Sequence, residues 1–128
     1  MSARRILVID DEDDIREVAQ MSLETLGGWD VLTADCGAAG LASAAAELPD
    51  VILLDVMMPD MDGPSTLQQL RSDPVTAGIP VVFLTAKVRA SDRQSLTDLG
   101  GDAVLSKPFD PVTLSDEIVA ALGWSTTR

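Results

Sequence analysis

The 128 residues carry 21 acidic and 9 basic side chains, and their net charge of −12 repels nucleic-acid phosphates and anionic lipid surfaces. We therefore expect no direct binding to nucleic acid. Because the chain has no histidine or tyrosine and only one cysteine, Cys36, it excludes Ser-His-Asp hydrolysis, histidine-ligated zinc and an internal disulfide. Its chemistry must use Asp, Glu, Lys, Ser or Thr.

The length fits a single domain over residues 1–128, with a core at about 4–123 and a short tail at 124–128. No apolar segment approaches the roughly 18 residues that a membrane span requires. The first apolar run stops at Asp10, which is too early for a secretory signal. We expect no membrane insertion and a cytoplasmic location.

Five short runs rich in β-branched residues and leucine, each bounded by turn residues or acids, predict strands. They are Arg5–Ile9, Trp29–Thr33, Val51–Leu54, Pro80–Leu84 and Ala103–Leu105. Apolar residues at helical spacing follow each run and predict five helices. Helices should end at Gly27-Gly28 and Gly100-Gly101, and they should begin at Asp62-Gly63-Pro64 and Asp110-Pro111.

This strict alternation of strands and helices predicts an α/β fold with parallel strands joined by right-handed crossovers. The result is a doubly wound five-stranded parallel sheet with helices on both faces, and the flavodoxin-like strand order 2-1-3-4-5 suits five such units. Val51–Leu54 and Val81–Leu84 are apolar at every position, so these strands should be central.

Polar side chains follow four of the predicted strands, and parallel strands bring their carboxyl ends to one edge of the sheet. These residues are Asp10-Asp11-Glu12, Asp55, Thr85 and Ser106-Lys107. Carboxylates held close together repel one another unless a cation neutralises them, and oxygen ligands favour Mg²⁺. An aspartate in such a pocket can act as a nucleophile on phosphorus.

The motifs VIDDE, LLDVMMPDMDG, FLTA and SKPF occur in this order over essentially the whole chain. Together they resemble the response-regulator receiver domain of two-component signalling. The resemblance implies that Asp55 is the phosphoacceptor, that Thr85 hydrogen-bonds a phosphoryl oxygen and that Lys107 forms an ion pair with it. It also implies a cis peptide bond between Lys107 and Pro108.

The resemblance further implies a Mg²⁺ site, in which Mn²⁺ could substitute. Its ligands would be Asp11, Asp10 acting partly through water, Asp55 and the backbone carbonyl of Met57. Many receivers carry an aromatic residue at the position of Val104, so the usual aromatic switch is in doubt. Met57 and Lys87 occupy positions that tune the lifetime of the phosphoryl group in this family.

By the same resemblance, a histidine kinase or a histidine phosphotransfer protein donates the phosphoryl group, as in a phosphorelay. The domain then catalyses its own phosphorylation and dephosphorylation and turns over no small-molecule substrate. Output would pass by protein contact, either to a separate downstream target or through a phosphorelay. The fourth helix, fifth strand and fifth helix could also form a phosphorylation-dependent dimer.

Three alternatives remain open. A Mg²⁺-dependent phosphatase or hydrolase of similar fold commonly has a second acid two residues after its nucleophile, where this chain has Met57. A flavin or dinucleotide binder needs a phosphate-binding turn after its first strand, where this chain has acids. A pseudo-receiver would keep the fold only as a binding module. Lys87, Arg89 and Arg93 are interpreted as surface charges, and Asp13 and Asp14 as a helix start.

Overall fold

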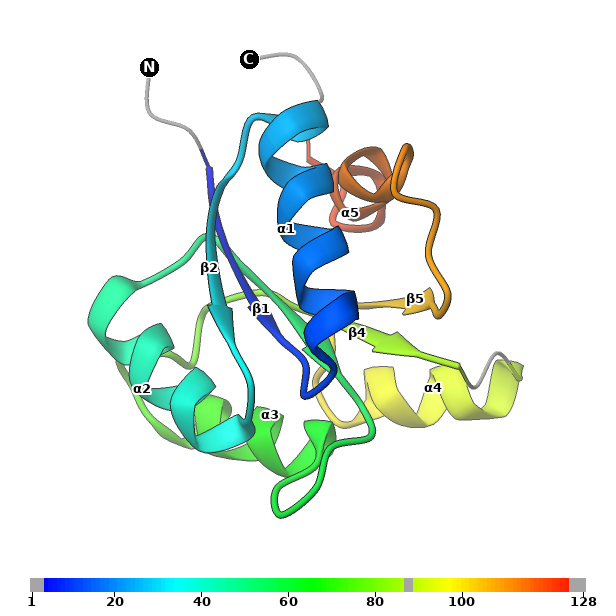
Figure 1. Ribbon diagram of the computed structural model, residues 1–128. Coiled ribbons are helices and arrows are strands. Elements are labelled where there is room, and N and C mark those ends of the chain that lie inside the picture. Colours follow the sequence, from blue (N-terminus) through cyan, green and yellow to red (C-terminus); the bar gives the residue numbers. More distant parts are fainter. Residues whose placement is uncertain (1–3, 87–88, 125–128) are drawn as a thin grey trace.

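The computed structural model describes residues 4–86 and 89–124 and contains five strands alternating with five helices (Figure 1). The strands are β1 (Arg5–Ile9), β2 (Asp30–Ala34), β3 (Val51–Asp55), β4 (Val81–Thr85) and β5 (Ala103–Ser106). The helices are α1 (Asp13–Gly27), α2 (Gly37–Glu47), α3 (Gly63–Ser72), α4 (Ala90–Asp98) and α5 (Leu114–Ala121). Within the described residues, no helix is both long enough and apolar enough to cross a membrane.

All strand pairs are parallel, and the order β2-β1-β3-β4-β5 confirms the predicted topology with β3 at the centre. Four strands end one residue later than predicted, at Ala34, Asp55, Thr85 and Ser106. Asp55 pairs with Leu84, and Thr85 pairs with Ser106. Ladder pairing depends on the backbone, so a polar side chain at the end does not stop it.

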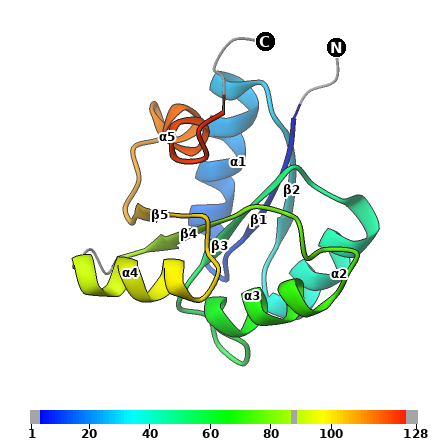
Figure 2. The same cartoon turned by 180° about the vertical axis from the view of Figure 1, so that it is seen from behind.

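Side chains along the central strands alternate between two cores, one on each face of the sheet. Leu7 and Ile9 of β1 pack toward the face covered by α2, α3 and α4, whereas Ile6 and Val8 pack toward α1 and α5. Figure 2, seen from behind, shows the same division of the helices. With both faces covered, the edge at the carboxyl ends of the strands is where polar groups can gather.

The helices begin and end close to the residues predicted for them, with one exception. Gly28 ends α1 in the left-handed region at φ 68°, and the Asp62 side chain caps α3 by accepting a hydrogen bond from the Ser65 N–H at 2.8 Å. The predicted helix start at Asp110-Pro111 is wrong, because α5 begins at Leu114. There the Asp110 carboxylate accepts a hydrogen bond from the Val112 N–H at 2.9 Å and closes a turn instead.

The two tryptophans connect the segment after α5 to the residue before β2. Their rings stack with centroids 6.3 Å apart, and the Trp29 indole N–H donates a hydrogen bond to the Ser115 hydroxyl at 2.8 Å. The Arg4 guanidinium lies 4.5 Å from the centre of the Trp124 ring. Residues 125–128 of the predicted tail lie outside the described residues.

Candidate functional site

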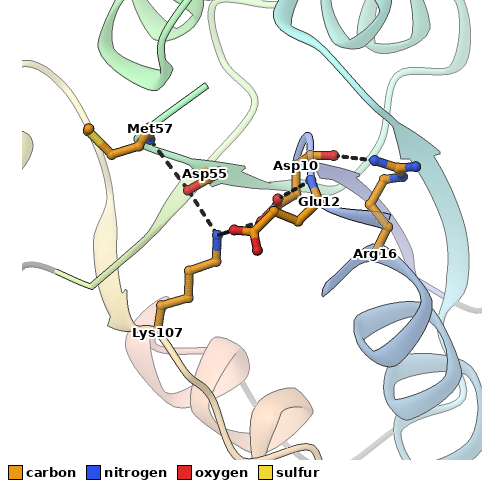
Figure 3. A network of polar contacts seen from close by, with 6 residues as sticks. All are labelled: Asp10, Glu12, Arg16, Asp55, Met57 and Lys107. Carbon is orange, nitrogen blue, oxygen red and sulfur yellow. Dashed lines mark hydrogen bonds and ion pairs between the residues drawn. The ribbon is translucent and has the colours of Figure 1, made fainter. Parts of the chain in front are cut away.

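The sheet edge brings together the polar residues that the sequence placed at the strand ends. Asp10 follows β1, Asp55 and Thr85 end β3 and β4, and Lys107 follows β5. Figure 3 shows the Lys107 side chain extending toward the carboxylates from the opposite side of the pocket. The convergence follows from parallel strand order, because β1 and β4 are the two neighbours of β3.

Asp10 and Asp55 are the buried acids of the pocket, with residue exposures of 1% and 3%. The backbone holds Asp10 in place, since its Oδ1 accepts a hydrogen bond from the Glu12 N–H at 2.9 Å and its N–H donates to the carbonyl of Ala34 at 3.1 Å. The Arg16 guanidinium donates to the Asp10 carbonyl at 2.7 Å. Asp10 is therefore fixed from the start of α1 and from β2.

Lys107 supplies the positive charge at the centre of the pocket. Its Nζ lies 3.0 Å from Glu12, 3.1 Å from Asp10 and 3.3 Å from Asp55, measured to the nearest carboxylate oxygen. The Lys107 N–H donates to the Thr85 carbonyl at 2.8 Å, and the bond between Lys107 and Pro108 is cis, as the resemblance predicted. The backbone contact fixes where the lysine side chain starts.

Burial and the neighbouring charges shift the pKa values of Asp55 and Lys107. Burial raises the pKa of Asp55 from 3.8 to about 6, and the charge of Asp10 adds to this rise, whereas Lys107 and the Met57 N–H oppose it. Burial alone would lower the pKa of Lys107, but its interactions with Glu12, Asp10 and Asp55 raise that pKa above its ordinary value. The lysine therefore stays charged, and Asp55 ionises closer to neutral pH than an ordinary aspartate does.

The arrangement fits a divalent cation. One carboxylate oxygen from each of Asp10, Asp11, Glu12 and Asp55 can be chosen so that all four lie within 4.8 Å of one another. Oδ2 of Asp55 is buried and accepts no hydrogen bond from the described residues, whereas the buried Oδ2 of Asp10 lies 3.1 Å from the Lys107 Nζ. Buried carboxylate oxygens without donors need a cation, and a donor set made only of oxygen suits a hard ion.

Thr85 and Met57 also lie at this edge. Thr85 is buried with 2% exposure. The Met57 side chain is 66% exposed, and its N–H donates to Asp55 Oδ1 at 3.4 Å. A metal contact through the Met57 carbonyl stays a prediction, and Lys87 lies outside the described residues.

Sequence reasoning gave no role to Glu12, although its carboxylate belongs to the same cluster. Its position in the sequence, directly after Asp10-Asp11, could have indicated that Glu12 belongs to the site.

The interpretation of Arg93 as a surface charge is wrong, because its guanidinium is partly buried and donates to the Val104 carbonyl at 3.1 Å. Arg89 is exposed as expected. Val104 itself is 8% exposed and packs in the core beneath α4.

The sequence matches the response regulator receiver domain over residues 6–119. It is 40% identical over 119 residues to the alkaline phosphatase synthesis transcriptional regulatory protein PhoP of Bacillus subtilis, covering 93% of this chain and 48% of PhoP. It is 44% identical over 115 residues to the response regulator PleD of Caulobacter vibrioides, covering 89% of this chain and 25% of PleD. The chain thus spans between a quarter and a half of these relatives.

Solved structures agree with the sequence match. The chemotaxis response regulator CheY4 of Vibrio cholerae superposes with a TM-score of 0.88 at 30% identity, covering 94% of this chain and 100% of that chain. A CheY-like receiver domain protein of Methanospirillum hungatei superposes with a TM-score of 0.82 at 28% identity, covering 95% of each chain. The chain belongs to the response regulator receiver domain family, the phosphoacceptor signalling domains of two-component systems.

Proposed function

We propose that Asp55 is the phosphoacceptor of this receiver domain. The observation that carries this proposal is the convergence of Asp55 with Asp10 and Lys107 at one sheet edge, where Asp55 Oδ2 is buried without a hydrogen-bond donor among the described residues. That oxygen is available to form a new bond. Asp11 and Glu12 are exposed, and Asp10 is fixed by backbone hydrogen bonds, so Asp55 is the best-placed acid.

In the proposed reaction, a carboxylate oxygen of Asp55 forms a bond to the phosphorus of a phosphohistidine on the donor protein. The phosphorus–nitrogen bond breaks at the same time, and its electron pair returns to the imidazole ring. The Lys107 ammonium lies where negative charge accumulates, and the Met57 N–H donates toward Asp55 Oδ1. Hydrolysis later returns Asp55 to a free carboxylate and releases inorganic phosphate.

Mg²⁺ is the metal proposed for the acidic cluster, with Mn²⁺ as a substitute. Asp10, Asp11 and Asp55 would hold it, together with the Met57 carbonyl. When bound, it supplies positive charge that neutralises the clustered carboxylates and the incoming phosphoryl oxygens. The buried Oδ2 atom of Asp55, which has no donor among the described residues, supports this assignment.

Receiver domains take their phosphoryl group from histidine kinases or histidine phosphotransfer proteins, and we propose such a donor for this chain, which has no histidine of its own. After transfer, Thr85 would hydrogen-bond a phosphoryl oxygen and Lys107 would pair with it, which would alter the surface formed by α4, β5 and α5. That surface is the proposed contact for a protein target or a second copy of the chain. A switch from 1:99 to 99:1 needs about 5.5 kcal/mol of differential stabilisation.

The test is stoichiometric labelling with a small phosphodonor. Incubation with Mg²⁺ and acetyl phosphate should add one acyl phosphate, measured by intact-protein mass spectrometry, and Asp55→Asn should abolish the labelling. Asp60→Asn is the matched control, because Asn tolerates the left-handed conformation of Asp60 at φ 67° and the residue lies outside the acidic cluster. Unchanged labelling of Asp55→Asn refutes the assignment, and steady turnover of phosphate esters would favour a phosphatase.

A further inference from the structure

One ammonium group is shared by three carboxylates in this pocket. The side chains of Asp10 and Asp55 are 1% and 3% exposed, whereas that of Glu12 is 60% exposed. Of the three contacts, the one to Glu12 at 3.0 Å has hydrogen-bond geometry. The most exposed acid therefore holds the best-directed bond to Lys107 (Figure 3).

The position of Glu12 makes this bond notable. Glu12 occupies the N-cap position of α1, yet its side chain accepts no hydrogen bond from the first turn of the helix. Ser, Thr, Asp or Asn at that position typically stabilise a helix by accepting a hydrogen bond from its first turn. The Glu12 side chain reaches Lys107 instead, and so it links the start of α1 to the loop after β5.

A phosphoryl group on Asp55 changes the competition for Lys107. An ammonium has three N–H donors, and the three carboxylates already face it. Phosphorylation turns the Asp55 carboxylate into an acyl phosphate, and its phosphoryl oxygens then compete with Asp10 and Glu12 for the same ammonium. Releasing Asp10 would break an ion pair at a buried carboxylate that water does not reach, whereas water can solvate the exposed Glu12 carboxylate.

We propose that Glu12 is a positioning residue that holds Lys107 in the resting domain and competes with the phosphoryl group for its ammonium. Phosphorylation then releases Glu12 and not Asp10, and the strength of the Glu12–Lys107 contact limits how much of the phosphorylated state accumulates. This inference rests on the proposed role of Asp55 as the acceptor.

Beryllium trifluoride is a suitable probe, because it adds to a carboxylate oxygen and imitates a phosphoryl group without turnover. Its affinity for the 128-residue chain is measured by fluorine NMR at saturating Mg²⁺. Glu12→Gln should tighten binding roughly two- to fivefold, which is the range that a mostly exposed ion pair supplies. In the resting protein, the ε-methylene signals of Lys107 should also shift in this variant.

Two further variants distinguish the effect of the Glu12–Lys107 contact from the effect of negative charge near the pocket. Glu12→Asp keeps the charge but shortens the side chain, so it should tighten binding as Glu12→Gln does. Asp14→Asn removes one exposed charge from the first turn of α1 and should leave the affinity and the Lys107 signals unchanged. If Glu12→Asp behaves like the wild type while Asp14→Asn tightens binding, long-range charge is responsible and the proposal is wrong.

Other outcomes also overturn the proposal. If Glu12→Gln weakens Mg²⁺ binding more than Asp14→Asn does and does not tighten beryllium trifluoride binding, Glu12 belongs to the metal site. If wild type and Glu12→Gln bind the probe equally, there is no competition, although the acceptor role of Asp55 stands. Binding that survives Asp55→Asn removes the proposed function and this inference together.

Discussion

Arg93 and Ser106 connect α4 to the end of β5, since the guanidinium Nη2 donates a hydrogen bond to the Ser106 hydroxyl at 3.0 Å. Nη1 of the same side chain donates to the Val104 carbonyl at 3.1 Å. Ser106 is the register partner of Thr85, so this contact lies at the same sheet edge as Asp55, with β4 between the two strands. Val104 has no ring that could rotate, and Arg93 supplies a polar connection from α4 to the same strand.

Removal of this connection should destabilise the domain. Arg93→Ala deletes two hydrogen bonds from a charged, partly buried donor, and the free energy of unfolding should fall by about 1–3 kcal/mol. Arg89→Ala removes the same charge from an exposed position before α4, so its effect should stay within about 0.5 kcal/mol. Urea unfolding of the three proteins measures both. Equal stability of the two variants would show that the Arg93 contacts contribute nothing.

Phosphorylation should change the surface of α4, β5 and α5 mainly through backbone movement after β4, because Val104 offers no aromatic rotation. Amide NMR spectra before and after addition of acetyl phosphate and Mg²⁺ should show shifts in α4 and β5 as well as around Asp55. In Arg93→Ala, the shifts around Asp55 should remain while those in α4 become smaller. Shifts confined to the acidic pocket of the wild-type protein would contradict this prediction.

Stability without divalent metal should fall as the pH rises through the range in which Asp55 ionises. The pKa of Asp55 is about 6 in the folded protein and 3.8 when unperturbed, so between these values the folded state binds more protons than the unfolded state. The contribution of Asp55 is fully present below pH 3.8 and is lost above about pH 6. The loss amounts to roughly 1–3 kcal/mol.

Asp55→Asn tests this pH dependence, because an amide cannot ionise. In EDTA at pH 7.5 this variant should be more stable than the wild type by up to ~3 kcal/mol, and the difference should shrink toward pH 4. Urea unfolding across this pH range measures it. If the wild-type protein is more stable than Asp55→Asn at pH 7.5, the ion pair with Lys107 stabilises the folded state by more than burial of the Asp55 charge destabilises it.

Addition of Mg²⁺ should stabilise the wild-type domain by relieving the repulsion among Asp10, Asp11 and Asp55. A ligand at one hundred times its Kd stabilises the folded state by about 2.7 kcal/mol. Thermal unfolding with increasing Mg²⁺ should therefore show a rising Tm that EDTA reverses. The increase should be small in Asp11→Asn and normal in Asp60→Asn, and an equal increase in both would place the ion elsewhere.

The sequence was sufficient to predict the sheet and the convergence of Asp10, Asp55, Thr85 and Lys107. Strand order and strand ends follow from the alternation of apolar runs with helical spacing, and parallel strands leave one edge for all four residues. The late start of α5 was missed, because Asp110-Pro111 suits a turn as well as a helix start.

The contacts of Glu12 and Arg93 could not be predicted in this way. Glu12 and Lys107 are 95 residues apart in the chain, and both side chains are long enough to take many rotamers. Arg93 lies in a polar helix whose charges look solvated until β5 is placed beside it. Local patterns specify backbone elements well, but contacts between long side chains depend on how those elements pack.

Gly63 is required by the close approach of α3 to the acceptor strand. A Cβ at this position would lie 2.5 Å from the Asp55 carbonyl oxygen and 2.8 Å from the Val56 Cα, and both atoms belong to the backbone. Gly63→Ala should therefore move the end of β3, reduce the free energy of unfolding by about 1–3 kcal/mol and weaken Mg²⁺ binding.

Gly78→Ala is the matched control, because nothing lies within 4 Å of its added Cβ. It should be neutral or stabilise the domain by up to about 1 kcal/mol by restricting the unfolded chain. Urea unfolding and Mg²⁺ titration of both variants measure these effects, and a Gly63→Ala variant as stable as Gly78→Ala would show that the strand end can shift freely.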